Sequence, residues 1–205
     1  MNALADGTAK KLEVTLLKAE SNIIREVKAG LVDEMKVLNI MGGGGKETDE
    51  KMSSSQSREA LMEELNTLLS SHAYESAFVK ALSCSDLTVV MNLCGKLNPK
   101  DIFSAREDGT LPLSPPVVIS LVQQLSVDTS TNVDLKLAWL REALFALPTT
   151  DPDIVHHVPS VLAQLVRNLE EFCVKNTGTL DQVTASLVRK SRLIVQLAQS
   201  LIAGF

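Results

Sequence analysis

Aromatic side chains are scarce in this chain, whose 205 residues include five Phe, one Trp and one Tyr. Folds that bind single-stranded nucleic acids stack the bases on several aromatic rings, so this scarcity argues against that class of protein. The formal net charge of -5 argues in the same direction, because an acidic chain repels the phosphates of a nucleic acid. A nucleic-acid function of the whole chain is therefore not expected.

Cysteine is also sparse. Cys84, Cys94 and Cys173 are odd in number and far apart, which fits neither a disulfide framework nor paired zinc knuckles. We expect each to be a small buried side chain in a reducing compartment. The chain lacks the run of about 18 apolar residues that spans a membrane, and its start lacks the basic flank and apolar run of a secretory signal. The sequence thus predicts a soluble intracellular protein with no membrane contact.

A Gly- and Ser-rich segment divides the chain into two unequal parts. Residues 42–55, GGGGKETDEKMSSS, combine consecutive glycines, mixed charge and serines. Such a composition buries too little apolar surface to offset the entropy lost on ordering. We therefore predict a flexible linker at 42–55, between a helical segment at 1–41 and a domain at 56–205.

Before the linker, apolar residues recur at steps of three or four from Thr8 to Met41, which predicts one long amphipathic helix. Isolated helices are marginal in water, so its apolar face needs a partner. The helix either self-associates as a coiled coil, which Gly30 weakens, or folds back on the domain that follows. A ridge at heptad spacing supplies the candidate self-association residues Leu17, Ile24, Leu31 and Leu38.

After the linker, the apolar period stays helical to the end of the chain. Seven or so short helices joined by short polar turns predict an all-α fold. Helix hairpins of this length stack as in an α-solenoid of the HEAT or armadillo kind. The predicted fold is therefore a HEAT/armadillo-like stack of helix hairpins, preceded by the long amphipathic helix.

Capping residues predict where several of these helices begin. Ser85 is expected to cap a helix over residues 87–97, followed by a loop over about 101–113. Ser114 with Pro115 is expected to open the next helix, and Pro159 to kink or restart a later one. Thr179 and Gln182 form an expected capping box for the last helix.

Catalytic motifs are not found. Residues 42–46 depart from a phosphate-binding loop at both ends and follow a predicted helix instead of a strand. The adjacent His156 and His157 would point about 100° apart on a helix, so they cannot ligate one ion from the same face. We expect one exposed and one partly packed imidazole, and a protein that is not an enzyme and holds no cofactor or metal.

The last predicted helix is locally basic within an acidic protein. Between residues 175 and 205, Asp181 is the sole acidic residue. Such a patch would bind an acidic peptide or RNA phosphates. Without interleaved aromatic residues it is a weak signature of nucleic-acid binding, and the alternative is a solvated helix face with no ligand. The basic residues are Lys175, Arg189, Lys190 and Arg192.

Trp139 is the single tryptophan, and it lies just outside the strict apolar stripe of its predicted helix. It is either a core residue between hairpins or an exposed anchor for a partner, and interface hot spots are rich in Trp and Arg. From charge and expected exposure, the candidate partner-binding residues are Lys136, Trp139, Arg141, Arg189, Lys190 and Arg192.

Two longer stretches resemble a known family. Residues 76–103, SAFVKALSCSDLTVVMNLCGKLNPKDIF, and residues 112–144 resemble the C-terminal domain of the enhancer-of-mRNA-decapping scaffolds, called Hedls in animals and Varicose in plants. The most specific parts are SLVQQL at 120–125 and LKLAWL at 135–140.

This resemblance implies a non-catalytic scaffold of cytoplasmic mRNA turnover. Members of the family join the decapping enzyme and its activator, concentrate in processing bodies and self-associate. Their helical C-terminal domain contributes to processing-body targeting and protein contacts. The propeller expected at the other end of such proteins is absent from this sequence, so the chain resembles a part of one. RNA binding by the basic last helix is the alternative function.

Overall fold

The computed structural model describes residues 54–105, 111–178 and 181–205, with side chains from Arg58 onward. The predicted helix at 1–41, its ridge of Leu17, Ile24, Leu31 and Leu38, and the linker up to residue 53 lie outside the described residues. Those described form eight α-helices and no strand, which confirms the all-α prediction. The helices are α2 (Ser54–Ser70), α3 (Tyr74–Ser83), α4 (Leu87–Lys96), α5 (Pro99–Phe103), α6 (Pro115–Val127), α7 (Val133–Ala146), α8 (Val158–Lys175) and α9 (Gln182–Ile202).

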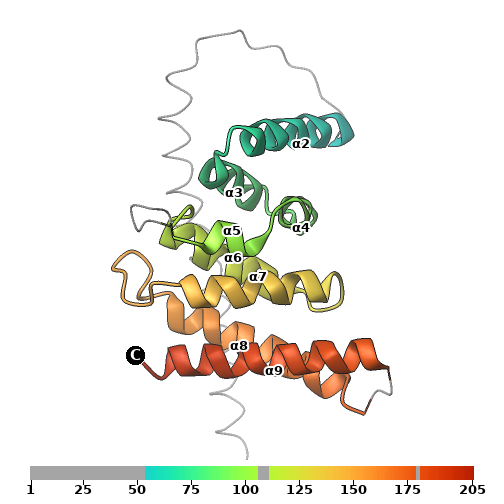
Figure 1. The fold of residues 1–205 in the computed structure, drawn as a ribbon, viewed down its shortest axis with the longest axis vertical. Coiled ribbons are helices and arrows are strands. Elements are labelled where there is room, and N and C mark those ends of the chain that lie inside the picture. The colour runs from blue at the N-terminus through green and yellow to red at the C-terminus, as the bar shows by residue number, and fades with distance from the viewer. Residues whose placement is uncertain (1–53, 106–110, 179–180) are drawn as a thin grey trace, which may run out of the picture. The chain divides into compact units, whose positions relative to one another are not determined.

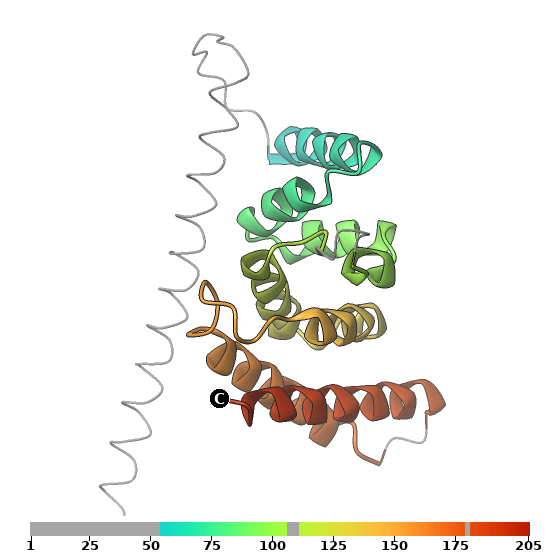
Figure 2. The same ribbon diagram turned by 60° about the vertical axis from the view of Figure 1, so that its left-hand side comes forward.

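The helices stack one after another from α2 to α9 (Figure 1), and the turned view in Figure 2 shows the same order. Helices α3, α6 and α8 pack in succession as one layer, while α5, α7 and α9 pack in succession as the other. Helix α8 packs along α9, and α6 packs on α7, so the two layers are joined by hairpins. This arrangement confirms the predicted HEAT/armadillo-like stack.

The capping prediction is wrong at two helix starts. Asp86, not Ser85, caps α4: its Oδ1 accepts a hydrogen bond from the Thr88 amide at 2.9 Å, and Ser85 has a φ of 54°. Asp181 caps α9 through its Oδ2, which accepts from the Thr184 amide at 2.8 Å, and Thr179 is outside the described residues. A carboxylate serves better at both sites because it also interacts with the helix dipole.

Prolines begin helices at three places in this stack. Ser114 and Pro115 start α6 as predicted, and Pro159 lies in the first turn of α8, so it restarts the helix and does not kink it. The short helix α5 was not predicted. Asn98 caps it by accepting from the Lys100 amide at 3.2 Å, and Pro99 supplies its first residue. Part of the predicted loop at 101–113 is thus helical, because Asn-Pro ends one helix and opens another.

Trp139 lies in the core with none of its surface exposed. Its ring packs against Phe78 of α3 and Phe103 of α5, with ring centroids 5.5 and 5.8 Å apart. Its Nε1 donates a hydrogen bond to the carbonyl oxygen of Cys94, at 3.2 Å, so its polar group is satisfied. Of the two interpretations, the core residue is correct, and Trp139 cannot act as an exposed anchor.

Lys136 is also buried, with only 2% of its surface exposed, which contradicts its predicted place on the surface. Its ammonium donates to the carboxylate of Asp128 at 2.8 Å and to the carbonyl oxygen of the same residue at 2.7 Å. These contacts join α7 to the turn before it. A buried ammonium needs such partners, which is why the side chain folds inward.

Side-chain amides join the helices of one layer. Gln124 on α6 donates to the carbonyl oxygen of Leu82 on α3 at 2.9 Å, and Asn168 on α8 donates to that of Ser126 on α6 at 2.7 Å. Each bond is accepted by a carbonyl near the C-terminal end of a helix, and that of Leu82 also accepts from the Ser85 amide at 3.4 Å. These bonds fix the spacing of successive helices.

We expect Trp139→Ala to lower the free energy of unfolding by about 4 kcal/mol, because it removes a fully buried aromatic side chain and leaves a cavity. Urea denaturation followed by circular dichroism measures the change. Phe145→Ala, at an exposed position on the same helix, is the matched control and should cost less than about 1 kcal/mol. Equal losses for the two variants would contradict the placement of Trp139.

A second prediction concerns Asp128, whose pKa is held well below its usual range by hydrogen bonds from Lys136, then from Ser130 and Thr131. A depressed folded-state pKa stabilises the fold above the unfolded value of about 4 and loses that contribution as the pH falls. Asp128→Asn should therefore cost about 3 kcal/mol at pH 7, since it leaves Lys136 buried without a counter-charge.

The difference in stability between wild type and Asp128→Asn should shrink as the pH is lowered from about 5 to 2. Asp134→Asn is the control, because its ion pair with Lys190 is exposed and contributes little at any pH. A difference that stays constant with pH would show that the Asp128 charge does not stabilise the fold.

Candidate protein-binding surface

An apolar groove lies between α7 and α9. The two helices run in the same direction within one layer (Figure 1) and enclose a cavity of about 500 Å³. We call this cavity the α7–α9 groove. It is lined by Asp134, Leu137, Ala138, Arg141 and Phe145 of α7, and by Lys190, Leu193 and Ile194 of α9.

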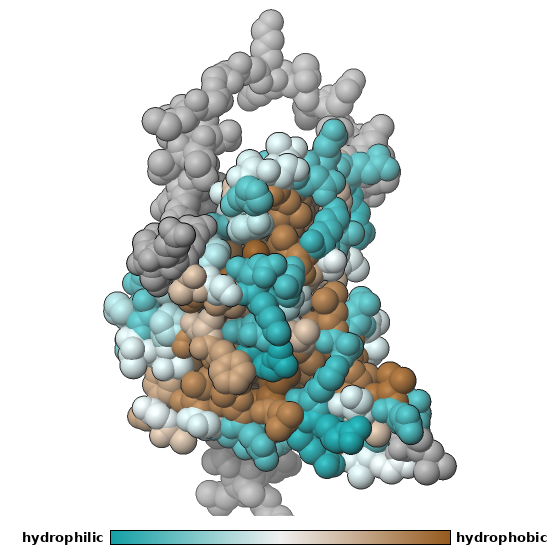
Figure 3. Space-filling view, viewed as in Figure 1, coloured by the Kyte–Doolittle hydropathy of each residue, from teal (hydrophilic) through white to brown (hydrophobic). Residues whose placement is uncertain are grey.

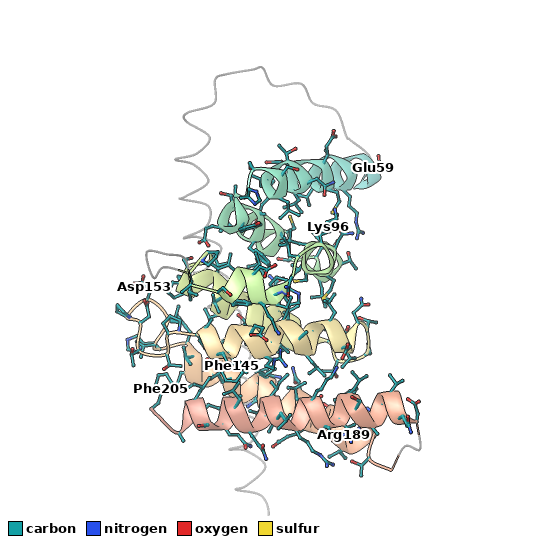
Figure 4. The ribbon with its side chains drawn as sticks, viewed as in Figure 1. Glu59, Lys96, Phe145, Asp153, Arg189 and Phe205 are labelled. Atoms are coloured by element: carbon teal, nitrogen blue, oxygen red, sulfur yellow. The ribbon has the colours of Figure 1, made fainter. Side chains whose placement is uncertain are left out.

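Helical spacing explains why these side chains share the groove. Positions 134, 137, 138, 141 and 145 form one stripe along α7, and 190, 193 and 194 form one along α9. Phe145 and Leu193 are 70% and 65% exposed and line the same groove, and exposed apolar side chains that lie together are typical of interaction sites. In Figure 3, hydrophobic surface gathers between α7 and α9, and Figure 4 shows Phe145 near the C-terminal end of α7.

The charges around the groove balance one another. Lys190 forms an ion pair with Asp134, and Arg141 Nε donates to a carboxylate oxygen of Glu142 at 3.0 Å. Because these exposed cations already have partners, they contribute little net charge. The groove therefore offers mainly shape and apolar contact.

A second pocket lies at the turn between α8 and α9. We call it the arginine pocket, because Arg189 and Arg192 line it and, within 54–105, 111–178 and 181–205, no acidic residue does. Its volume is about 670 Å³. Figure 4 shows Arg189 in the N-terminal half of α9. The other lining residues are Asn176, Thr177, Gly178, Gln182, Ala185, Ser186 and Val188.

The structure divides the predicted basic patch. Arg189 and Arg192 are three positions apart and point to the same side of α9, whereas Lys190 is about 100° away around the helix. Lys190 therefore lines the α7–α9 groove together with Arg141, while the two arginines line the arginine pocket. Lys136 and Trp139 reach neither site, because both are buried.

The two exposed apolar residues of the groove were not predicted from the sequence. Phe145 follows the buried Leu144, and Leu193 precedes the buried Ile194. Because each lies next to a buried apolar residue in the sequence, the pattern gives no sign that its side chain is exposed. The available signal was the position of Phe145 four residues after Arg141, on the charged side of α7.

In the part of the chain that the structure describes, no group of three or more His, Cys, Asp or Glu side chains is placed to hold a metal ion. His156 is exposed and His157 partly buried, as expected. Cys94 and Cys173 are buried, whereas Cys84 is exposed, contrary to expectation. Burial raises the pKa of the Cys94 thiol, which keeps it protonated and poorly nucleophilic.

Among the helices of the described ranges, none is both long and apolar enough to cross a bilayer.

Comparison with known proteins identifies the family. The family model described as "Enhancer of mRNA-decapping protein 4, C-terminal" matches residues 65–188, more than half of the chain. The chain belongs to this family. The resemblance seen in the sequence is thereby confirmed, and the match covers α7 but ends before the α9 residues of the groove.

Relatives show how small a part of a longer protein the chain corresponds to. The human Enhancer of mRNA-decapping protein 4 is 39% identical over 105 residues, which are 51% of this chain and 7% of the human protein. The Drosophila melanogaster homologue is 32% identical over 117 residues, 57% of this chain and 8% of that protein. The chain therefore spans less than a tenth of the length of either relative.

A solved structure shares the fold. The crystal structure of the conserved C-terminal region of Ge-1 is 29% identical and superposes with a TM-score of 0.59. The match covers 69% of this chain and 98% of that one. The helical stack therefore corresponds to almost the whole of that conserved region.

Proposed function

We propose that the chain is a non-catalytic scaffold module of mRNA decapping and decay that binds other proteins through the α7–α9 groove. The single observation that supports this proposal is an open groove with exposed apolar side chains, in a domain of a decapping-enhancer family. Its partners are the decapping enzyme, its activator or other mRNA-decay proteins.

The groove has the composition of a protein-binding site. Phe145 and Leu193 flank an apolar floor that includes Leu137 and Ile194, and the ion pairs form a polar rim. Interfaces with an apolar centre and a charged rim exclude water from the anchoring side chains. Fully burying a side chain such as Phe145 contributes about 1.5–3 kcal/mol.

Localisation follows from partner binding in this proposal. A scaffold that docks on decapping proteins concentrates in the cytoplasm where those proteins concentrate, in processing bodies. The segment at 1–41, for which the sequence predicts an amphipathic helix, adds self-association in this proposal, so several domains are held together. Linked copies of one binding site raise the effective concentration of partners.

RNA binding by the last helix is the second candidate, and the two arginines of the arginine pocket favour it. Its support is weaker, because Lys190 pairs with Asp134 and Lys175 with Glu171. Only Arg189 and Arg192 of the four basic residues are then left without an ion pair among the described side chains. RNA affinity that falls steeply with salt, and less steeply after the arginines are removed, would support it.

We expect Phe145→Asp with Leu193→Asp to weaken binding to the purified decapping enzyme or its activator at least tenfold, since each change places a charge in the apolar centre of the interface. Biolayer interferometry with the full chain measures the affinity, and circular dichroism shows that the helices remain.

Val174→Asp is the matched control, because Val174 is 75% exposed on α8 and lies outside the groove. It should leave the affinity within twofold. Unchanged binding by the groove variant, or an equal loss with Val174→Asp, would remove the groove from the proposal.

Self-association gives a further prediction. Deleting residues 1–41 should turn an oligomer into a monomer at the same concentration, because it removes the heptad ridge. Light scattering after size-exclusion chromatography gives the mass. Ile24→Asp with Leu31→Asp in the full chain should have the same effect, and an oligomer that survives both changes would place self-association elsewhere.

A further inference from the structure

The arginine pocket has the features of an anion-binding site. Arg189 and Arg192 are both exposed and lie one helical turn apart on α9. Ser186 and Gln182 of the same helix line the pocket with a hydroxyl and an amide, which can donate hydrogen bonds. Two cations and two neutral donors therefore surround one cavity, and the described lining contains no carboxylate to neutralise them.

Other exposed cations nearby are already neutralised. Lys190 pairs with Asp134, and Lys175 with Glu171. Within the described ranges neither arginine of the pocket has a carboxylate partner, and Arg192 lies next to the thiol of Cys173, which is neutral. Two uncompensated guanidinium groups facing one cavity raise its electrostatic potential and favour an anionic ligand.

The guanidinium group narrows the class of anion. Its planar fork matches the oxygens of a phosphate or carboxylate in a bidentate contact, and clustered arginines are the usual receptors of phosphorylated side chains. A cavity of about 670 Å³ accommodates one such side chain with its flanking backbone.

We infer that the arginine pocket binds a phosphorylated serine or threonine on a partner protein, or a cluster of carboxylates with the same chemistry. A protein ligand is favoured over RNA for two reasons. Among the described residues that line the pocket, none is an aromatic that could stack a base, and the chain carries a net charge of -5, which opposes a long polyanion. The site is separate from the α7–α9 groove.

The test uses the full chain and three fluorescent peptides of one neutral Gly-Ala sequence, which carry two adjacent phosphoserines, two glutamates or two serines. Fluorescence anisotropy at low ionic strength should show that the phosphoserine peptide binds at least tenfold more tightly than the serine peptide. Equal binding of the glutamate peptide would assign the pocket to clustered carboxylates and keep the inference.

Arg189→Gln with Arg192→Gln should weaken binding of the phosphoserine peptide at least tenfold. Lys190→Gln is the matched control, because it removes a neighbouring charge of the same sign on a different side of α9, and it should change the affinity less than twofold. Arg189→Lys with Arg192→Lys keeps the charge but loses the bidentate geometry, so an intermediate loss is expected.

Three results would overturn the inference. The first is equal affinity for all three peptides, and the second is an equal loss with Lys190→Gln, which would indicate a diffuse charge effect. The third is that a single-stranded RNA of similar length binds more tightly than the phosphoserine peptide, with a salt dependence that is reduced when the two arginines are replaced. That result would make the pocket an RNA contact. None of these results bears on the groove, whose test uses different residues.

Discussion

The fixed position of α7 is the constraint on which the rest of the described structure depends. Trp139 holds one side of the helix in the core, against Phe78 and Phe103, and its Nε1 satisfies a carbonyl of α4. Lys136 holds the N-terminal part through the carboxylate of Asp128. Together these two contacts set the rotation of α7, and the rotation decides that Phe145 points outward beside α9. The groove is thus a consequence of how the opposite side of the helix is buried.

Periodicity predicted the all-helical class and most helices because each apolar stripe is a local property of the sequence. Trp139 and Lys136 could not be placed in this way. The position of Trp139 depends on its packing against Phe78 and Phe103, which lie 61 and 36 residues earlier in the sequence. The burial of Lys136 depends on its long side chain, which reaches Asp128 in the preceding turn. The same limit applies to the basic patch. The sequence places Lys190 in one basic patch with Arg189 and Arg192, because the three are close together along the chain. In the helix, Lys190 lies on another side of α9, where it pairs with Asp134.

The family match and the two surface sites involve different parts of the chain. The family match over residues 65–188 and the superposition on the conserved C-terminal region of Ge-1 account for the stack that positions α7. The family match ends at residue 188, before the part of α9 that contributes Lys190, Leu193 and Ile194 to the groove and Arg189 and Arg192 to the arginine pocket. These two sites differ in chemistry, one apolar and one cationic, so a single helix can serve two kinds of contact in the proposed scaffold.

Hydrogen–deuterium exchange of the full chain, alone and with the purified decapping enzyme or its activator, tests the docking claim most directly, because backbone protection reports contact without any substitution. Docking in the α7–α9 groove predicts slower exchange in the complex over the C-terminal half of α7 and the middle of α9, with α2 unchanged. Protection confined to α3, α6 and α8, with α7 and α9 exchanging as in the free chain, would contradict it.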